Sequence, residues 1–156
     1  MGCAAARPSG VGWQAVAVAS DEARALVVRA AEALRPQRIG DRLCGDVAAV
    51  LVTDQGDHFS GVCIDTGSGT GFCAEASAIG AMVTAGQYRI ASIVAVWRSE
   101  EGRLHVLPPC GRCREFIRQM HPANLTTQVV LSDGRTAELR ELLPAHEWPQ
   151  PETWDY

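Results

Sequence analysis

The sequence predicts an α/β protein in which helices cover both faces of a mixed sheet of about five strands, giving three layers. Three observations predict this fold. Apolar residues repeat at helical spacing over 20–36, two apolar strands flank a turn within 46–64, and helix and strand patterns alternate from 73 to 143. A sheet with helices before, between and after its strands is normally buried on both faces.

The first half of the chain supplies an amphipathic helix and a hairpin. The helix over 20–36 has acidic residues in its first turn and stops at a proline. Residues 46–64 follow as two strands around a turn at 55–57, and the first strand is apolar enough to be buried on both faces. The segment 65–72 contains three glycines and predicts a loop that leads to Cys73.

The second half of the chain alternates between helices and strands. Small and apolar residues after the loop predict a helix that packs tightly on a sheet, and Gly86 is placed to end it. The expected elements are a helix over 73–85, a central strand over 89–97, a second helix over 110–120, a strand over 126–132 and a brief helix over 137–143.

Length and composition favour one domain. The 156 residues are 47% hydrophobic, which is enough for one well-buried core. We expect a flexible N-terminal tail over 1–14, a single domain over 15–146 and a C-terminal tail over 147–156. Trp148, Trp154 and Tyr156 crowd this second tail, so we expect it to act as a lid or as an interface segment.

Charge and hydropathy indicate a small-molecule partner. Eighteen acidic residues against fourteen basic ones give a formal net charge of -4, so the basic surface expected of a nucleic-acid-binding protein is missing. No apolar run approaches the roughly 20 residues needed to cross a bilayer, and the start lacks the pattern of a secretion signal. We therefore expect no nucleic acid or membrane partner, a cytoplasmic location, and reduced thiols for the six cysteines.

Three of these cysteines have the spacing of metal ligands. Cys110 and Cys113 lie three residues apart at the start of a predicted helix, so both sulfurs can point to one side. Cys73 begins another helix and supplies a third thiolate if the two helix starts lie side by side. Three protein ligands leave the fourth position of a tetrahedral zinc ion open for water, which is the arrangement of catalytic zinc.

Glu75 lies two residues after Cys73, in the same first turn, and can stand beside that water without binding the metal. An acid in this place can take up a proton and pass it on. This chemistry suits the hydrolytic loss of ammonia from an amino-substituted heteroaromatic ring. The sequence therefore predicts Zn²⁺ as the cofactor and Glu75 as the catalytic residue.

The motifs also resemble a known family. Cys-Ala-Glu at 73–75 followed by Pro-Cys-x-x-Cys at 109–113 is similar to the signature of the cytidine deaminase superfamily in its all-cysteine zinc version. The similarity to the small free-nucleoside deaminases extends over roughly 46–144. "CGRCR", "MHP" and the lack of arginine after the catalytic acid are most similar to the blasticidin-S deaminases. The resemblance implies the cytidine-deaminase-like version of the three-layer fold, an aminopyrimidine-type substrate and a homotetramer or homodimer.

Departures from the family pattern concern the substrate. Where the family usually carries an Asn and a Glu that bind the ribose and the pyrimidine, this chain has Cys63 and Asp65. Cys63 is a buried hydrophobe, a substrate contact or a fourth zinc ligand, and Asp65 is a loop cap or a hydrogen-bond acceptor for substrate. Phe72, which stacks on the substrate or anchors the loop, and Ala74 complete the candidate substrate-binding residues.

A further departure concerns charge. The arginine that usually follows the motif is Ala76 here, which leaves Arg112 and Arg114 as candidates to offset the thiolate charge. The expected function is zinc-dependent deamination of a cytosine-type base in a free nucleoside or nucleoside-like compound such as cytidine or blasticidin S. The alternative is a noncatalytic zinc-stabilised protein that binds a ligand or partner, and a four-sulfur metal shell would favour it.

Overall fold

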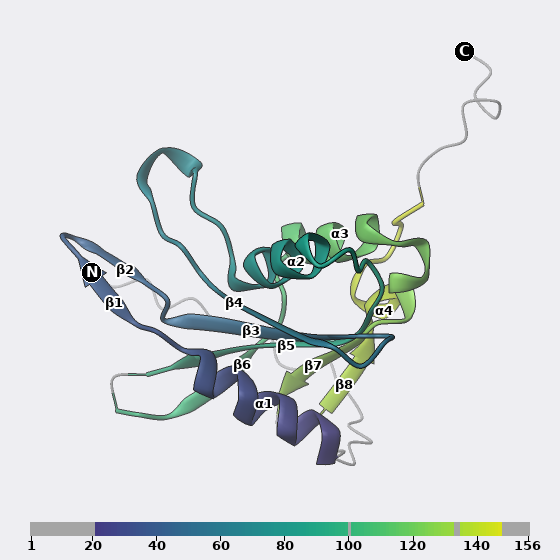
Figure 1. Ribbon diagram of the computed structural model, residues 1–156, viewed down its shortest axis with the longest axis horizontal. Coiled ribbons are helices and arrows are strands. Elements are labelled where there is room, and N and C mark those ends of the chain that lie inside the picture. Colours follow the sequence, from purple (N-terminus) through teal and green to yellow (C-terminus); the bar gives the residue numbers. More distant parts are fainter. Residues whose placement is uncertain (1–20, 100, 133–134, 148–156) are drawn as a thin grey trace, which may run out of the picture.

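The computed structural model describes residues 21–99, 101–132 and 135–147, and it has three layers (Figure 1). The tail predicted over 1–14, and residues 148–156 of the tail predicted over 147–156, lie outside these residues. The helices are α1 (Asp21–Ala33), α2 (Ala74–Thr84), α3 (Gly111–Met120) and α4 (Leu139–Leu142), with short 3₁₀ turns η1 (Gly67–Gly69) and η2 (Pro122–Thr126). The strands are β1 (Gln37–Ile39), β2 (Arg42–Cys44), β3 (Val47–Thr53), β4 (His58–Val62), β5 (Ile90–Arg98), β6 (Leu104–Leu107), β7 (Gln128–Ser132) and β8 (Arg135–Glu138).

The main sheet has six strands in the order β4-β3-β5-β7-β8, with β6 paired to the second half of β5. Strands β5 and β7 are parallel, and every other pair in this sheet is antiparallel. The sheet is therefore mixed, as the sequence predicts. The connection between the two parallel strands passes through β6, α3 and η2. Because β6 runs back along β5 and ends opposite Ala95, α3 begins beside the middle of the central strand.

Both faces of the central strands are buried. Strand β3 illustrates this, because its apolar residues alternate between the two faces of the sheet. Ala49 and Leu51 face one cluster of apolar side chains, and Val50 and Val52 face another. The first cluster lies under α2 and α3, and the second lies against α1, on the opposite face of the sheet (Figure 1). Among the described residues, no helix has both the length and the apolar character needed to cross a bilayer.

Four short strands were not predicted. The separate hairpin of β1 and β2 is mostly exposed, and β6 and β8 have four residues each with only partial burial. Strands β6 and β8 form against the longer strands β5 and β7, which offer backbone partners, and β1 and β2 pair with each other. The apolar pattern of all four is weak, so the sequence did not predict them. As a result the main sheet has six strands where about five were expected, and β8 begins two residues before the predicted brief helix.

Candidate metal centre and active-site pocket

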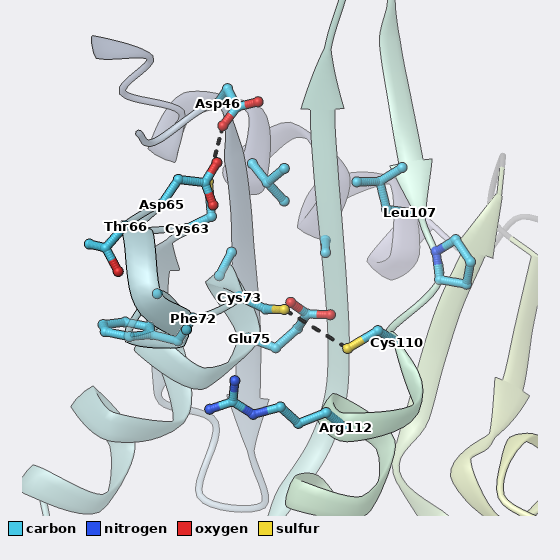
Figure 2. A pocket seen from close by; sticks show the side chains of 16 residues that line it. Asp46, Cys63, Asp65, Thr66, Phe72, Cys73, Glu75, Leu107, Cys110 and Arg112 are labelled. Atoms are coloured by element: carbon cyan, nitrogen blue, oxygen red, sulfur yellow. Dashed lines mark hydrogen bonds between the residues drawn. The ribbon is translucent and has the colours of Figure 1, made fainter. Parts of the chain in front are cut away.

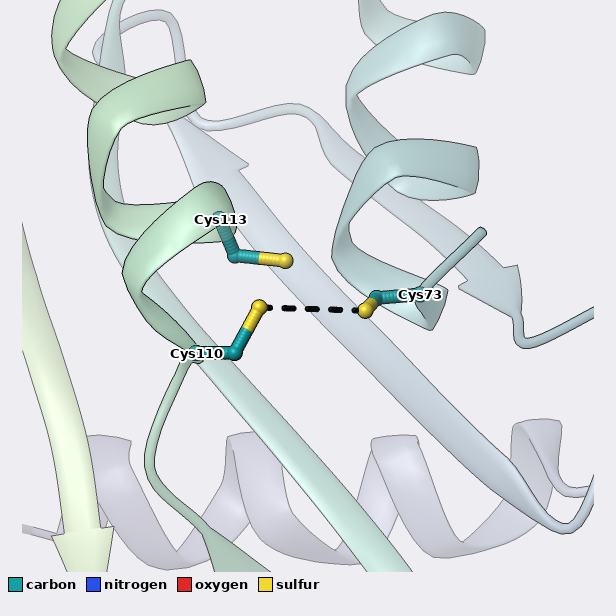
Figure 3. A group of neighbouring side chains, drawn as sticks. All are labelled: Cys73, Cys110 and Cys113. Atoms are coloured by element: carbon teal, nitrogen blue, oxygen red, sulfur yellow. Dashed lines mark hydrogen bonds between the residues drawn. The ribbon is translucent and has the colours of Figure 1, made fainter. Parts of the chain in front are cut away.

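Two helix starts bring three cysteines together. Cys73 and Cys110 are the N-cap residues of α2 and α3, and both have extended backbone conformations that turn the chain into the helix. Cys113 lies one turn further along α3. The two starts lie side by side, with the three thiols directed into the space between them (Figure 3). The sulfur atoms all lie within 4.8 Å of one another, so the predicted convergence is present.

The spacing of these sulfurs suits zinc. Two sulfur ligands at about 2.3 Å in a tetrahedral shell are roughly 3.8 Å apart. The Sγ atoms of Cys73 and Cys110 are 3.9 Å apart. Among the described residues, the cluster contains three cysteines and no fourth cysteine. The Cys63 thiol donates to Asp46, and the Cys44 thiol donates to the Asp65 backbone carbonyl. This arrangement leaves room for a non-protein ligand, as in catalytic zinc sites.

The pKa values of these thiols depend on burial and on the neighbouring groups of the cluster. Burial, followed by nearby negative charge and hydrogen bonding, raises the pKa of the Cys113 thiol, and burial also raises the pKa of Cys73. Burial acts in the same direction on Cys110, but hydrogen bonds from Cys113 and Cys73 outweigh it and lower the Cys110 pKa. Three soft thiolates gathered at two helix N-termini are a donor set that zinc matches well.

Glu75 belongs to the same site. It lies in the first turn of α2, only 5% of it is exposed, and its carboxylate faces the pocket beside the cysteines (Figure 2). Burial raises the pKa of the Glu75 carboxyl above its usual value, and hydrogen bonds with the backbone and with Cys113 only partly oppose this. A buried acid beside a metal centre is the arrangement expected of a proton carrier.

A cavity of about 490 Å³ is lined by Cys73, Cys110 and Glu75. This volume lies in the range of small-molecule sites. All four candidate substrate-binding residues line it: Cys63, Asp65, Phe72 and Ala74. Sequence reasoning missed Asp46, Thr66, Leu107 and Pro108, which also line the cavity. The pairing of β3 with β4 could have indicated Asp46. Asp46 directly precedes β3, and Cys63 directly follows β4, so antiparallel pairing places the two residues near each other.

The two candidate arginines have different surroundings. The Arg114 guanidinium donates hydrogen bonds to the backbone carbonyls of Pro109, at 2.8 Å, and Leu142, at 2.9 Å. Arg112 instead lines the cavity that contains Cys73 and Cys110 (Figure 2). Arg112 is therefore the better placed of the two to offset negative charge at the cysteines.

Comparison with known proteins agrees with this geometry. Residues 21–129, more than half of the chain, match the family described as the cytidine and deoxycytidylate deaminase zinc-binding region. The chain belongs to this family of zinc-binding deaminases, and zinc is its cofactor. The superfamily that the cysteine motifs predicted is thus confirmed.

Among individual relatives, blasticidin-S deaminase from Bacillus cereus is 41% identical over 81 residues, which are 49% of this chain and 58% of that protein. The chain thus spans less than two thirds of the length of this relative. The crystal structure of cytidine deaminase from Mycobacterium tuberculosis has a TM-score of 0.63 at 25% identity, covering 78% of this chain and 94% of that one.

A second solved structure gives the same result. Cytidine deaminase from Burkholderia pseudomallei also has a TM-score of 0.63, at 28% identity, and covers 78% of this chain and 96% of its own. These similarities confirm the three-layer, cytidine-deaminase-like fold. Family and fold together support a hydrolytic deaminase.

Proposed function

We propose that this protein is a zinc-dependent hydrolase that deaminates a cytosine-type base in a free nucleoside or nucleoside-like compound, such as cytidine or blasticidin S. The observation that carries the proposal is that Glu75 and two cysteines of the cluster, Cys73 and Cys110, line one cavity large enough for a nucleoside. Blasticidin-S deaminase and cytidine deaminases among the relatives support the choice of substrate class.

Each residue has a distinct part in this proposal. Cys73, Cys110 and Cys113 hold the zinc ion, which when bound supplies a Lewis acid that lowers the pKa of water. Phe72 and Ala74, on either side of Cys73, pack against the flat base. Arg112 lines the same cavity and offsets the negative charge of the thiolates.

Glu75 moves the protons. The carbon that bears the amine gains a bond to the oxygen of water and loses its bond to nitrogen, so that an amine and water become a carbonyl and ammonia. Glu75 accepts a proton from the attacking water and delivers it to the ring nitrogen. It then takes the remaining proton from the hydroxyl added to the carbon and gives it to the amine, which leaves as ammonia while the carbonyl forms. The buried position of its carboxylate in the first turn of α2 keeps it within the cavity for both steps.

The test combines metal analysis with a substrate panel. We expect about one zinc per chain, and ammonia release from at least one of cytidine, deoxycytidine and blasticidin S, followed by ultraviolet absorbance. Glu75→Gln should keep its zinc and lose at least about a hundredfold in kcat. Glu115→Gln, on α3 and outside the cavity, is the matched control. An unchanged rate in Glu75→Gln would remove Glu75 from the mechanism.

The noncatalytic alternative has its own outcome in the same experiment. Zinc at about one per chain without ammonia from any compound, in a protein that loses its fold on chelation, would favour a purely stabilising metal. A purely stabilising metal would also be expected to have a four-sulfur shell. The directions of Cys44 and Cys63 away from the cluster argue against such a shell within the described residues.

The resemblance to small nucleoside deaminases leads us to propose also that the protein acts in the cytoplasm as a homotetramer or homodimer. Light scattering coupled to size-exclusion chromatography would give the mass in solution. A mass of one chain at micromolar concentration would contradict the assembly without affecting the proposed chemistry.

A further inference from the structure

Asp46 and Cys63 meet on the cavity wall, at the end away from the cysteine cluster. The Cys63 thiol donates a hydrogen bond to Oδ1 of Asp46, with an Sγ–Oδ1 distance of 3.1 Å. Figure 2 shows this pair together with Asp65 and Thr66 at one end of the cavity, and Glu75, Cys73 and Cys110 at the other. The non-reacting part of a substrate whose base lies at the metal would extend toward Asp46.

The backbone fixes the position of the thiol relative to the carboxylate. The Cys63 N–H donates to the Val47 carbonyl, and the Gly45 N–H donates to the Cys63 carbonyl, each at 3.0 Å. These two hydrogen bonds attach Cys63 to the residues on either side of Asp46. The thiol is therefore a fixed donor that orients one oxygen of the carboxylate.

Cys63 has no second proton to offer. Only 7% of the residue is exposed, and burial, followed by the hydrogen bond to Asp46, raises the pKa of its thiol. The sulfur thus keeps its single proton, which Asp46 already accepts. Cys63 lines the cavity as a positioning residue, and the carboxylate that it orients has the remaining hydrogen-bonding capacity.

Charges are unevenly placed along the cavity. At the Asp46 end, the described residues include the carboxylates of Asp46 and Asp65, and neither forms an ion pair with a described basic residue. The basic residue of the cavity lining, Arg112, lies at the metal end (Figure 2). Two acceptor groups without a cation favour donors and cations in the ligand, and they oppose anions such as phosphate.

We infer that Asp46, oriented by Cys63, is a specificity-determining residue that accepts hydrogen bonds from the non-reacting part of the substrate and favours an amine or guanidinium there over a hydroxyl or phosphate. This inference rests on the proposed function, because the substrate it refers to is the nucleoside that the protein deaminates. It assigns recognition to a carboxylate that the family motif does not include, in addition to Asp65 at the motif position.

The test uses nucleosides that differ in one group. The zinc-loaded protein is given cytidine, 5′-amino-5′-deoxycytidine and cytidine 5′-monophosphate, and kcat/KM for ammonia release is measured. In parallel, calorimetry gives the dissociation constants of uridine, 5′-amino-5′-deoxyuridine and uridine 5′-monophosphate. This second readout needs no turnover. In the wild type we expect the amine to be preferred over the hydroxyl by about tenfold in both readouts, and the phosphate to be worst.

A variant of Asp46 separates the effect of its negative charge on ligand preference from the effect of its size and shape. Asp46→Asn keeps the size and an oxygen for the Cys63 thiol but removes the charge, so the preference for the amine should fall to within about twofold. With cytidine as substrate, Asp46→Asn should change KM rather than kcat. Asp41→Asn is the control, because Asp41 is 96% exposed and outside the cavity.

Cys63 is tested by a conservative and a non-conservative change. Cys63→Ser retains a donor and should retain the preference for the amine. Cys63→Ala loses the donor and should raise KM for the amine several-fold. A purely structural role would instead lower the melting temperature and zinc content without changing the ranking of the three ligands.

The outcomes distinguish this inference from the proposed function. Ammonia release with the same ranking in the wild type and Asp46→Asn would overturn the inference and leave the deaminase in place. Charge-dependent binding that Asp46→Asn abolishes, without ammonia from any cytosine compound, would support the inference and overturn the deaminase. Binding in the wild type that ignores the charge of the ligand would overturn the inference whatever the activity.

Discussion

Gly61 in β4 and Ala78 in α2 approach each other so closely that a Cβ on Gly61 would lie 2.3 Å from the Ala78 backbone nitrogen. The same contact includes the Cβ of Ser77, whose hydroxyl donates a hydrogen bond of 2.7 Å to the Val62 carbonyl. The first two turns of α2 are thus held directly against the strand. Because Cys73 and Glu75 lie in the first of these turns, this contact sets how far both side chains reach into the cavity.

Replacing Gly61 with alanine should therefore damage stability and metal binding together. The added methyl group meets backbone atoms, which cannot move aside as a flexible side chain would. We expect Gly61→Ala to lower the free energy of unfolding by about 1–3 kcal/mol and to weaken zinc binding. Chemical denaturation and competition with a zinc-binding dye measure the two effects.

Gly80→Ala is the matched control in the same helix. Nothing lies within 4 Å of a Cβ on Gly80, which is exposed, so this change should be neutral or stabilising by up to about 1 kcal/mol. Equal stability and zinc affinity in Gly61→Ala and the wild type would mean that the helix can move away from the strand without consequence.

A second prediction concerns Asn124, a fully buried residue that joins three segments. Its Oδ1 accepts from the Ile90 N–H at 2.8 Å, and its Nδ2 donates to the carbonyls of Ile117 and Tyr88. Asn124→Ala leaves these backbone groups without a partner, and each such group costs about 1–3 kcal/mol. Because three groups lose their partner, we expect a loss of at least about 3 kcal/mol in denaturant unfolding.

Thr126→Ala serves as its control. The Thr126 hydroxyl also bonds a carbonyl, that of Ala123, but it is exposed, so water can replace the lost partner. A change of less than about 0.5 kcal/mol is expected there. Similar losses in both variants would show that burial of the Asn124 network is not what makes it important.

A third prediction separates the two arginines of α3. Arg114 bonds two backbone carbonyls through different nitrogens of its guanidinium, so Arg114→Lys keeps the charge but cannot reproduce both bonds. We expect Arg114→Lys to lower the melting temperature, and Arg112→Lys to leave it within about one degree of the wild type. Thermal unfolding followed by circular dichroism tests both, and an equal loss in the two variants would contradict the assignment.

The sequence was sufficient for the parts of the fold and site that depend on strong local patterns. The apolar runs gave β3 and β5, and the cysteine spacing together with two helix starts gave the cluster of Cys73, Cys110 and Cys113. Strands β6 and β8 were missed because each has only four residues, partly exposed, and carries little apolar signal of its own, although each pairs with the strand that precedes it in sequence.

Asp46 was missed for a different reason. Its role depends on strand register, since only the pairing of β3 with β4 brings the residue before one strand next to Cys63 after the other. A one-residue change of register would turn alternate side chains to the opposite face and separate the pair. Predicting a recognition site built from two strands therefore requires knowledge of the strand register. Predicting a pair of metal ligands within one helical turn does not.

A fourth prediction uses pH to detect the bond between Cys63 and Asp46. Burial raises the pKa of the Cys63 thiol, and the hydrogen bond to Asp46 and its negative charge raise the pKa further. Asp46→Asn removes the charge and weakens the acceptor while burial remains, so the thiol should ionise at lower pH in this variant. Because alkylation requires the thiolate, the rate for Cys63 should rise at lower pH in Asp46→Asn than in the wild type.

Iodoacetamide labelling of the zinc-loaded protein between about pH 7 and 10, read for the Cys63 peptide by mass spectrometry, measures this shift. Asp65→Asn is the control, because its carboxylate does not take part in the hydrogen bond of the Cys63 thiol. Bound zinc protects the cluster cysteines, and the peptide readout separates Cys63 from Cys44. Identical pH profiles for the wild type and Asp46→Asn would mean that the Cys63 thiol does not donate to this carboxylate in solution. That result would also contradict the role of Cys63 in orienting Asp46.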